Sequence, residues 1–450
     1  MKKTPSHYFF DNIQLRQLIL PLMVEQLLSI SVGAIDTIMV SSVGENAVSG
    51  LALVETINIL LINIFAALAT GGAVVASQYL GKNNDKKARE ACKQLLFVAT
   101  GIAIVVAVLV IVFEGSILRT IFGDVGKEIM EHAMVYFFIS ALGYPFIALY
   151  NGGAAIFRSM GNSRISMRTS LLMNGLNVCG NTLFIFGFGW GVAGAALSTL
   201  LSRIIGSILI TRRLNDDSLP LYVKHLKDYR FDWQMVKRIL SIAIPSGFEN
   251  GIFQGGKIIV QSLVSTFGAA SIAANAVIGN FSSFMIVPGA AIGLALIPVV
   301  GRCVGANDYD QAKFYIRKLM GYAYVTTAAS SLLFVVLKQP MFQLYSLSNE
   351  TMRIADVLIM MMAVGNIVLW NMAFAFPNAL RASNDAKFTM VVSIISMFTC
   401  RVFLAYFLTG FFHLRIEAVY IGMLVDWLLR STCFYLRYRN GKWMNRKLIT

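Results

Sequence analysis

The sequence predicts an all-α polytopic membrane protein. Three observations point to this class: a low content of charge, a series of long apolar segments, and basic residues concentrated in alternate loops. The chain has 450 residues, of which 57% are hydrophobic and 14% are charged, and its mean hydropathy is +0.67. Soluble domains carry roughly 45–50% apolar and about 25% charged residues. This chain has too little polar surface to face water on every side, so the bilayer is its expected solvent.

The apolar segments come first, because a helix needs about 20 mostly apolar residues to cross a bilayer. About twelve such segments are expected, and they cover 15–40, 50–80, 94–113, 132–157, 169–187, 191–211, 239–266, 271–301, 319–337, 354–380, 388–409 and 416–436. The second and the eighth are longer than one straight crossing requires, so each is expected to tilt or bend. Pro288 and Pro298 favour kinks in the eighth.

The basic residues then orient these segments. With the N-terminus placed in the cytoplasm, 30 of the 38 Lys and Arg residues fall on the cytoplasmic side. Five fall outside, and three lie within segments, namely Arg203, Lys257 and Arg401. Membrane proteins concentrate Lys and Arg in cytoplasmic loops, so both termini are predicted to be cytoplasmic. The net charge of +15 is then explained by the loops, and no nucleic-acid partner is expected.

The two halves of the chain resemble one another at an offset of 224 residues. The matched pairs include Pro21 with Pro245, Glu25 with Glu249, Gly44 with Gly268 and Asn83 with Asn307, and an offset of 223 places Arg158 over Arg381. Both halves start on the same face, so their pseudo-two-fold axis should lie along the membrane normal. We expect two six-helix bundles: an N-terminal lobe over 1–211, a cytoplasmic linker over 212–238 and a C-terminal lobe over 239–450.

Ionisable residues inside spans are expected to have a function or a specific partner, because inserting each one at the centre of a membrane helix costs about 2.5–3.5 kcal/mol. Asp36 and Glu25 share one face of the first segment, and Asp36 has no obvious basic partner in its own helix. We therefore favour a functional role for Asp36. In the fifth segment Asn174, Asn177 and Asn181 recur at helical spacing. These amides either belong to a polar site or hydrogen-bond neighbouring helices.

The other charged residues within spans have plainer interpretations. For Glu25 and Glu249, a structural ion pair and cation coupling are equally compatible with the sequence. Lys257 lies two helical turns beyond Glu249, and we interpret these two as a structural pair. Asp426 and Arg430 have the i, i+4 spacing of an ordinary helical ion pair.

Patterns typical of enzymes are absent from the sequence. It contains no GxxxxGK[ST] loop, its four His are dispersed, and its five Cys never occur at metal-binding spacing. We expect no catalytic residues, no metal site and no cofactor. A deformable substrate cavity is predicted instead, since Met and aromatic side chains adapt to varied apolar ligands. Its candidate lining residues are Tyr144, Tyr150, Asn174, Met285, Met361 and Trp370.

Three runs carry a resemblance to a known family. The run PLMVEQLLSISVGAIDTIMVSSVGENAVSGLAL, from Pro21 to Leu53, resembles the first span and loop of the multidrug and toxic compound extrusion (MATE) transporters. ALYNGGAAIFRSMGN and NVCGNTLFIFGFGWGVAGAALST resemble the region of the fourth to sixth spans. The resemblance covers nearly the whole chain. It implies two six-helix bundles in a V shape, located in the plasma membrane and functional as a monomer. It also implies export of organic cations or other amphipathic compounds in exchange for H+ or Na+.

The resemblance also assigns site residues. Asp36 matches the cation-binding aspartate of the first span, and Asn177 matches an asparagine of the same cluster. Asn181 stands where many members have aspartate. We therefore predict that Asp36, Asn177 and Asn181 couple to the cation.

The C-terminal lobe departs from the family pattern. Trp370 and Asn371 occupy the neighbourhood in which one branch has an acidic residue, and Glu249 lies closer to Pro245 than the usual glutamate of the seventh span. Glu25, Glu249 and Lys257 are therefore predicted only as secondary polar sites.

Two other functions compete with drug export. A lipid-linked oligosaccharide flippase of the same superfamily shares the two-lobe plan, but its cavity is expected to carry several Arg or Lys for phosphate. Here only Arg203, Lys257 and Arg401 lie within spans. A channel or sensor is the alternative from a different class, and transport that collapses with an ion gradient would exclude it.

Overall fold

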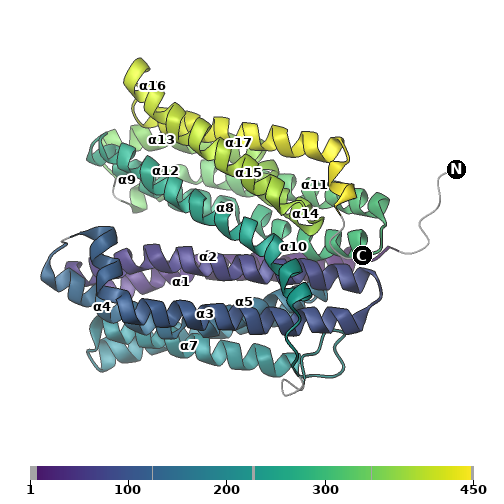
Figure 1. Ribbon diagram of the computed structural model, residues 1–450. Helices are drawn as coiled ribbons and strands as arrows, with labels where there is room; N and C mark the ends of the chain where they lie inside the picture. Colours follow the sequence, from purple (N-terminus) through teal and green to yellow (C-terminus); the bar gives the residue numbers. More distant parts are fainter. Residues whose placement is uncertain (1–7, 124, 225–228, 346, 447–450) are drawn as a thin grey trace. The chain divides into compact units, whose positions relative to one another are not determined.

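The computed structural model describes residues 8–123, 125–224, 229–345 and 347–446. Within these residues the chain is built from helices joined by short loops, and it contains no β-strand. This confirms the predicted all-α class. The chain divides into two compact units, with the boundary inside one long helix (Figure 1). The N unit is Asn12–Gly247, and the C unit is the chain from Phe248 onward together with the residues before Asn12.

The N unit contains seven α-helices, one π-helix and the start of α8 among its described residues. They are α1 (Asn12–Ser41), α2 (Glu45–Gly81), α3 (Asp85–Phe122), α4 (Lys127–Leu142), α5 (Tyr144–Ser159), α6 (Arg164–Asn181), the π-helix η1 (Thr182–Gly187), α7 (Gly191–Leu214) and the start of α8 (Trp233–Ser265). Helix α2 packs against α3, α4 and α5, and α6 packs against α1 and α7. Of the predicted linker 212–238, residues 225–228 lie outside the described residues.

The C unit continues with α8 and the helices after it. They are α9 (Ala269–Met285), α10 (Val287–Gly305), α11 (Tyr309–Val336), α12 (Lys338–Leu344), α13 (Asn349–Gly365), the π-helix η3 (Asn366–Ala375), α14 (Pro377–Ala382), α15 (Ala386–Ser396), the π-helix η4 (Met397–Phe403), α16 (Leu404–Phe412), α17 (Ile416–Arg439) and the short 3-10 helix η5 (Lys442–Asn445). The backbone N–H of Phe10, just before α1, donates to Tyr315 Oη on α11 at 2.8 Å.

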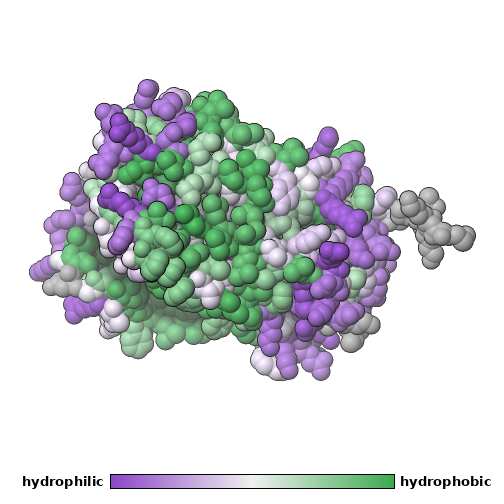
Figure 2. Space-filling model, turned by 90° about the horizontal axis from the view of Figure 1, so that it is seen from above, coloured by the Kyte–Doolittle hydropathy of each residue, from purple (hydrophilic) through white to green (hydrophobic). Residues whose placement is uncertain are grey.

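Among the described residues, nine helices are long and apolar enough to cross a membrane, or ten if the bent pair α4 and α5 forms one span. The break between α4 and α5 bends the chain by 46°. Helices α6 and α8 are not among them, since asparagines and charged residues interrupt their apolar sequence. Figure 2 shows a broad hydrophobic surface with hydrophilic residues gathered towards its ends. The count of twelve spans, the cytoplasmic termini and the V shape stay predictions.

The loops of the two halves repeat in conformation. Asn83 and Asn307, which the sequence repeat relates, both have left-handed backbones, with φ of 55° and 56°. The side chain of the next residue caps the following helix in each half: Asn84 accepts from the backbone of Lys87, and Asp308 accepts from the backbone of Gln311. Asparagine is one of the few residues that adopts this conformation readily. The matched asparagines therefore close equivalent helix-to-helix turns.

Candidate cation-coupling site

The N unit buries a carboxylate against an amide. Asp36 lies in the C-terminal part of α1 and is 6% exposed. Asn181, the last residue of α6, donates from Nδ2 to Asp36 Oδ1 at 2.6 Å. No Lys, Arg or His nitrogen forms an ion pair with Asp36 within the described part of the chain. The carboxylate is therefore hydrogen-bonded to a neutral partner and has no ion-pair partner of its own within the described residues.

Further oxygen atoms surround this pair. Asn177 Oδ1 accepts a long hydrogen bond of 3.4 Å from Asn181, and Asn177 Nδ2 donates to Thr199 Oγ1 on α7 at 3.0 Å. Asn181 Oδ1 is buried and has no hydrogen-bond partner among the residues described. A carboxylate, amide oxygens and a hydroxyl are the donors that a hard cation prefers. We call Asp36, Asn177, Asn181 and Thr199 the Asp36 cluster.

The structure adds a second carboxylate that the sequence reasoning did not single out. Glu55 on α2 accepts hydrogen bonds at 3.0 Å from Asn58 Nδ2 and from Tyr136 Oη. Tyr144, predicted as a cavity residue, donates from its hydroxyl to Asn58 Oδ1 at 2.8 Å. The sequence could have indicated Glu55 as a candidate site residue, because it interrupts an apolar segment in the same way as Asp36.

The acid pair related by the repeat forms two equivalent ion pairs. Arg158 Nη1 lies 3.3 Å from Glu25 Oε1, and Arg381 Nη2 lies 2.7 Å from Glu249 Oε2. Ser166 donates to Glu25 at 2.8 Å. Each glutamate therefore has a basic partner. These contacts agree with a structural ion pair, which was one of the two interpretations of both residues.

Glu249 has hydroxyl partners as well. Thr389 and Ser393 donate to it at 3.2 and 2.7 Å. The predicted pair of Lys257 with Glu249 is wrong, because Arg381 and these hydroxyls occupy the carboxylate. Lys257 instead places its ammonium 5.3 Å from the centre of the Phe253 ring, one turn away on the same helix. The predicted pair of Asp426 with Arg430 is confirmed, with Nε and Oδ1 2.7 Å apart.

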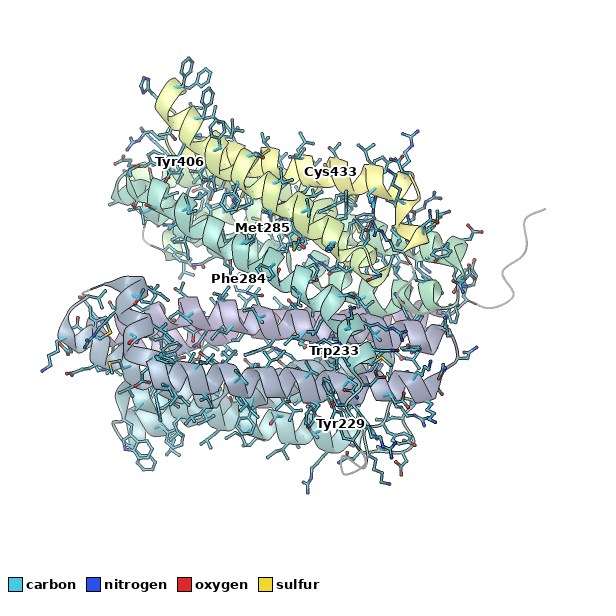
Figure 3. The ribbon with its side chains drawn as sticks, in the orientation of Figure 1. Tyr229, Trp233, Phe284, Met285, Tyr406 and Cys433 are labelled. Atoms are coloured by element: carbon cyan, nitrogen blue, oxygen red, sulfur yellow. The ribbon has the colours of Figure 1, made fainter. Side chains whose placement is uncertain are left out.

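The predicted cavity residues occupy different environments. Tyr150 and Met285 are buried in helix packing, and Tyr150 donates to the carbonyl of Ser166 at 3.2 Å (Figure 3 labels Met285). Trp370 is 8% exposed and stacks with Phe374. Met361 and Asn174 are half-buried, and Asn174 donates to the carbonyl of Ser170 at 2.7 Å. Their role in binding substrate stays a prediction.

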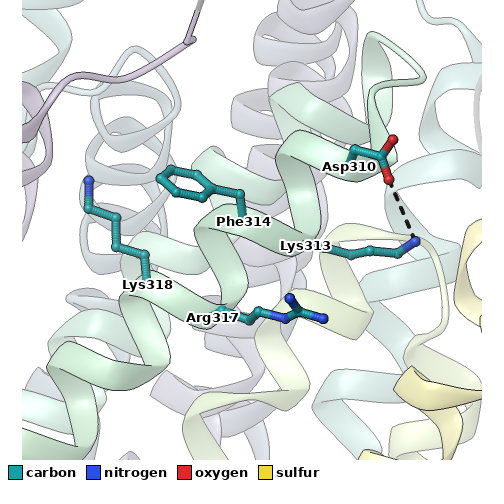
Figure 4. Close-up of a pocket in the computed structure, with 5 residues that line it drawn as sticks. All are labelled: Asp310, Lys313, Phe314, Arg317 and Lys318. Atoms are coloured by element: carbon teal, nitrogen blue, oxygen red, sulfur yellow. Dashed lines mark ion pairs between the residues drawn. The ribbon is translucent and has the colours of Figure 1, made fainter. Parts of the chain in front are cut away.

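An open depression of about 600 Å³ lies on α11, and none of the predicted cavity residues lines it (Figure 4). Its lining residues are Asp310, Lys313, Phe314, Arg317 and Lys318. Lys313 and Asp310 lie 3.8 Å apart across it. These residues belong to the first turns of α11, and none of them was predicted as a site.

Comparison with known proteins finds relatives whose sequences match nearly the whole chain. The MatE family model matches this chain twice, over residues 21–183 and 245–407, so that its two matches are offset by 224 residues. "Uncharacterized transporter YisQ" of Bacillus subtilis is 28% identical over 437 residues, which are 95% of this chain and 94% of that protein. "Probable multidrug resistance protein NorM" of Thermotoga maritima is 25% identical, and the match covers 97% of this chain and 94% of NorM.

Solved structures share the fold. One described as "Outward-facing conformation of a multidrug resistance MATE family transporter of the MOP superfamily" has a TM-score of 0.90 at 19% identity, and the match covers 96% of each chain. A MOP superfamily transporter from Pyrococcus furiosus has a TM-score of 0.88 at 20% identity, again over 96% of each chain. The family model covers more than half of the sequence and reproduces its internal repeat. The chain therefore belongs to the MatE family, the multidrug and toxic compound extrusion transporters, and it is a multi-pass plasma-membrane protein.

Proposed function

We propose that the protein is a secondary-active antiporter. It exports organic cations, amphipathic drugs or toxic metabolites in exchange for H+ or Na+, by alternating access. It uses no cofactor besides the coupling ion, and it works as a monomer. The names of relatives support drug export, since NorM of Thermotoga maritima is called a probable multidrug resistance protein.

The observation that carries the proposal is the burial of Asp36 without an ion-pair partner among the described residues. A buried carboxylate without a basic partner is costly in a low-dielectric span. Binding a proton or a sodium ion removes that cost, and the amide and hydroxyl oxygens of the Asp36 cluster can complete the coordination of Na+. The cluster is therefore suited to exchanging a small cation.

Coupling follows if the cation and the substrate favour different arrangements of the helices. A ligand shifts a conformational equilibrium only through its different affinities for the two states. Cation binding at Asp36 then favours the arrangement that releases substrate outside, and loss of the cation to the cytoplasm resets the protein. The gradient of the cation supplies the free energy for export.

Uptake of ethidium into everted vesicles, which corresponds to export from the cell, tests this proposal when it is driven by an imposed gradient of pH or Na+. Asp36→Asn should insert and fold, since the amide is nearly isosteric, but gradient-driven efflux should be lost. Asp310→Asn is the matched control, because the Asp310 side chain is 99% exposed on α11 and should leave efflux unchanged. Full efflux by the Asp36→Asn protein at wild-type expression, with the same gradient dependence, would exclude coupling at Asp36.

A further inference from the structure

The C unit gathers positive charges around one aromatic ring. Lys257 Nζ and Arg401 Cζ each lie 5.3 Å from the centre of the Phe253 ring, and Arg430 Cζ lies 5.2 Å from it. Phe253 and Lys257 are one turn apart on α8, whereas Arg401 comes from η4 and Arg430 from α17. Three helices therefore bring like charges together, and these charges need a negative partner.

Within the described residues, one carboxylate forms ion pairs with this group, and it does not balance the charge. Asp426 Oδ1 lies 2.7 Å from Arg430 Nε, while Arg401 Nη1 is 3.8 Å from the other carboxylate oxygen. Glu249, one turn before Phe253, is held by Arg381. An excess of positive charge therefore remains inside a span, where unneutralised charge is costly.

Arg401 also has unused hydrogen-bond donors. The residue is 8% exposed, and its Nε and Nη1 are buried without a hydrogen-bond partner in the described part of the chain. Buried polar groups in native proteins are nearly always hydrogen-bonded. Lys257 is exposed, so the group is open on its side. A ligand arriving beside Lys257 would find a free ammonium and the unsatisfied guanidinium of Arg401.

Aromatic rings continue from the charged group. Phe253 packs edge-on against Phe374, with ring centres 5.5 Å apart, and Phe374 contacts both Trp370 and Trp427. Arg430 also lies over the Phe374 ring at 5.4 Å. The charged group thus borders an apolar surface, which suits a ligand with an acidic head and an apolar body.

We propose that Lys257 and Arg401 form an oxyanion-binding site in the C unit, which takes amphipathic compounds that bear a phosphate, sulfonate or carboxylate. The repeat offsets place Gly33 and Val178 at the corresponding positions of the N unit, so the site has no counterpart there. The two halves then have opposite polarity, with Asp36 for a cation and this site for an anion. As a substrate site it rests on the proposed export function, and it extends the substrate class to acidic amphiphiles.

Binding to the purified full-length protein in a neutral maltoside detergent tests this site without requiring transport. Isothermal titration with octyl phosphate should show saturable binding. Lys257→Gln and Arg401→Gln should each weaken it roughly tenfold or more, because each removes a charge-assisted hydrogen bond. Lys237→Gln is the matched control, since Lys237 is an exposed lysine on the same helix, and it should keep wild-type affinity. Octyl phosphate affinity unchanged by both site substitutions would overturn the proposal.

Three further arms complete the experiment. Octyltrimethylammonium has the same tail and the opposite charge, so an equal loss of its binding in the two variants would overturn an oxyanion site. Inorganic phosphate that binds as tightly as octyl phosphate would overturn the amphipathic ligand. Asp36→Asn should still bind octyl phosphate saturably, and that binding should still be weakened by Lys257→Gln, which separates failure of this site from failure of cation coupling. Melting temperatures report folding, and Lys257→Gln alters an exposed residue, so the test does not depend on Arg401→Gln being stable.

Discussion

The side chains of the Asp36 cluster differ in their hydrogen-bond partners. Asn181 touches the carboxylate directly, whereas Asn177 accepts from Asn181 and donates to Thr199. The contacts are single hydrogen bonds, and such bonds between membrane helices average about 0.6 kcal/mol. Removing one should change the affinity for the coupling cation more than it changes the folded yield.

Asn177→Ala should therefore weaken efflux and shift its dependence on pH or Na+, while the yield of folded protein stays near wild type. The substitution removes an amide oxygen from the cluster and frees Asn181 to move. The comparison is Asn63→Ala on α2, whose amide likewise bonds back to a carbonyl of its own helix, that of Ile59. Normal transport by Asn177→Ala with an unchanged pH and Na+ profile would leave the asparagines as interhelical packing residues.

The paired glutamates should behave alike, because the repeat gives each an arginine and a hydroxyl. Glu25→Gln and Glu249→Gln each leave a half-buried arginine without its carboxylate, and breaking a buried ion pair costs about 3–5 kcal/mol. Thermal unfolding in detergent should show both variants clearly destabilised. Glu131→Gln is the control, since its pair with Lys127 is exposed at the surface, and such pairs contribute about 0–1 kcal/mol. Wild-type stability of either buried variant would refute a structural role for that glutamate.

At the level of helices, close backbone approach sets the packing of α2 on the start of α8. A Cβ atom on Gly71 would lie 2.5 Å from the carbonyl oxygen of Ile239, and backbone cannot move aside as a flexible side chain does. Small residues allow membrane helices to approach in this way. The contact joins the first helix after α1 to the helix that follows the linker.

Gly71→Ala should destabilise the protein by about 1–3 kcal/mol, the usual cost of overpacking a core. Gly101→Ala on α3 is the matched control, because a Cβ there meets nothing within 4 Å. Alanine is also the better helix former by about 1 kcal/mol, so the control should be neutral or stabilising. Equal melting temperatures for the two variants would show that α2 and α8 do not approach this closely.

At the scale of the whole molecule, the loop charges predict which side each turn faces. Single cysteines placed in a background without the five native ones should react with an impermeant maleimide according to side. Residues 83, 224 and 307 should be labelled from the cytoplasm, and residues 45, 127 and 348 from outside. Asn83 and Asn307 close equivalent turns, so the repeat requires them on the same face. Cytoplasmic labelling at position 45 would break the model of twelve spans.

The sequence by itself determined the class of the protein, its internal repeat and the residues that stand out in its spans. These properties are local or periodic: hydropathy is summed along a helix, and a repeat is found by sliding the chain. The pair of Asp426 with Arg430 was predictable for the same reason, since four residues separate its members on one helix. Asp36 was recognisable because a carboxylate in an apolar segment is costly wherever the helix packs.

Only the tertiary structure decided which side chains meet. Glu25 and Arg158 are 133 residues apart, Glu249 and Arg381 are 132 apart, and no pattern along the chain joins them. The predicted pair of Lys257 with Glu249 was wrong because the prediction considered a single helix. The actual partner of Glu249 is Arg381, which lies on another helix. Arg401 joins Lys257 only through the packing of η4 beside α8, where a Cβ on Gly256 would meet Met397. The direction of each side chain about its helix axis is set by helix packing, and that packing depends on contacts between residues far apart in sequence.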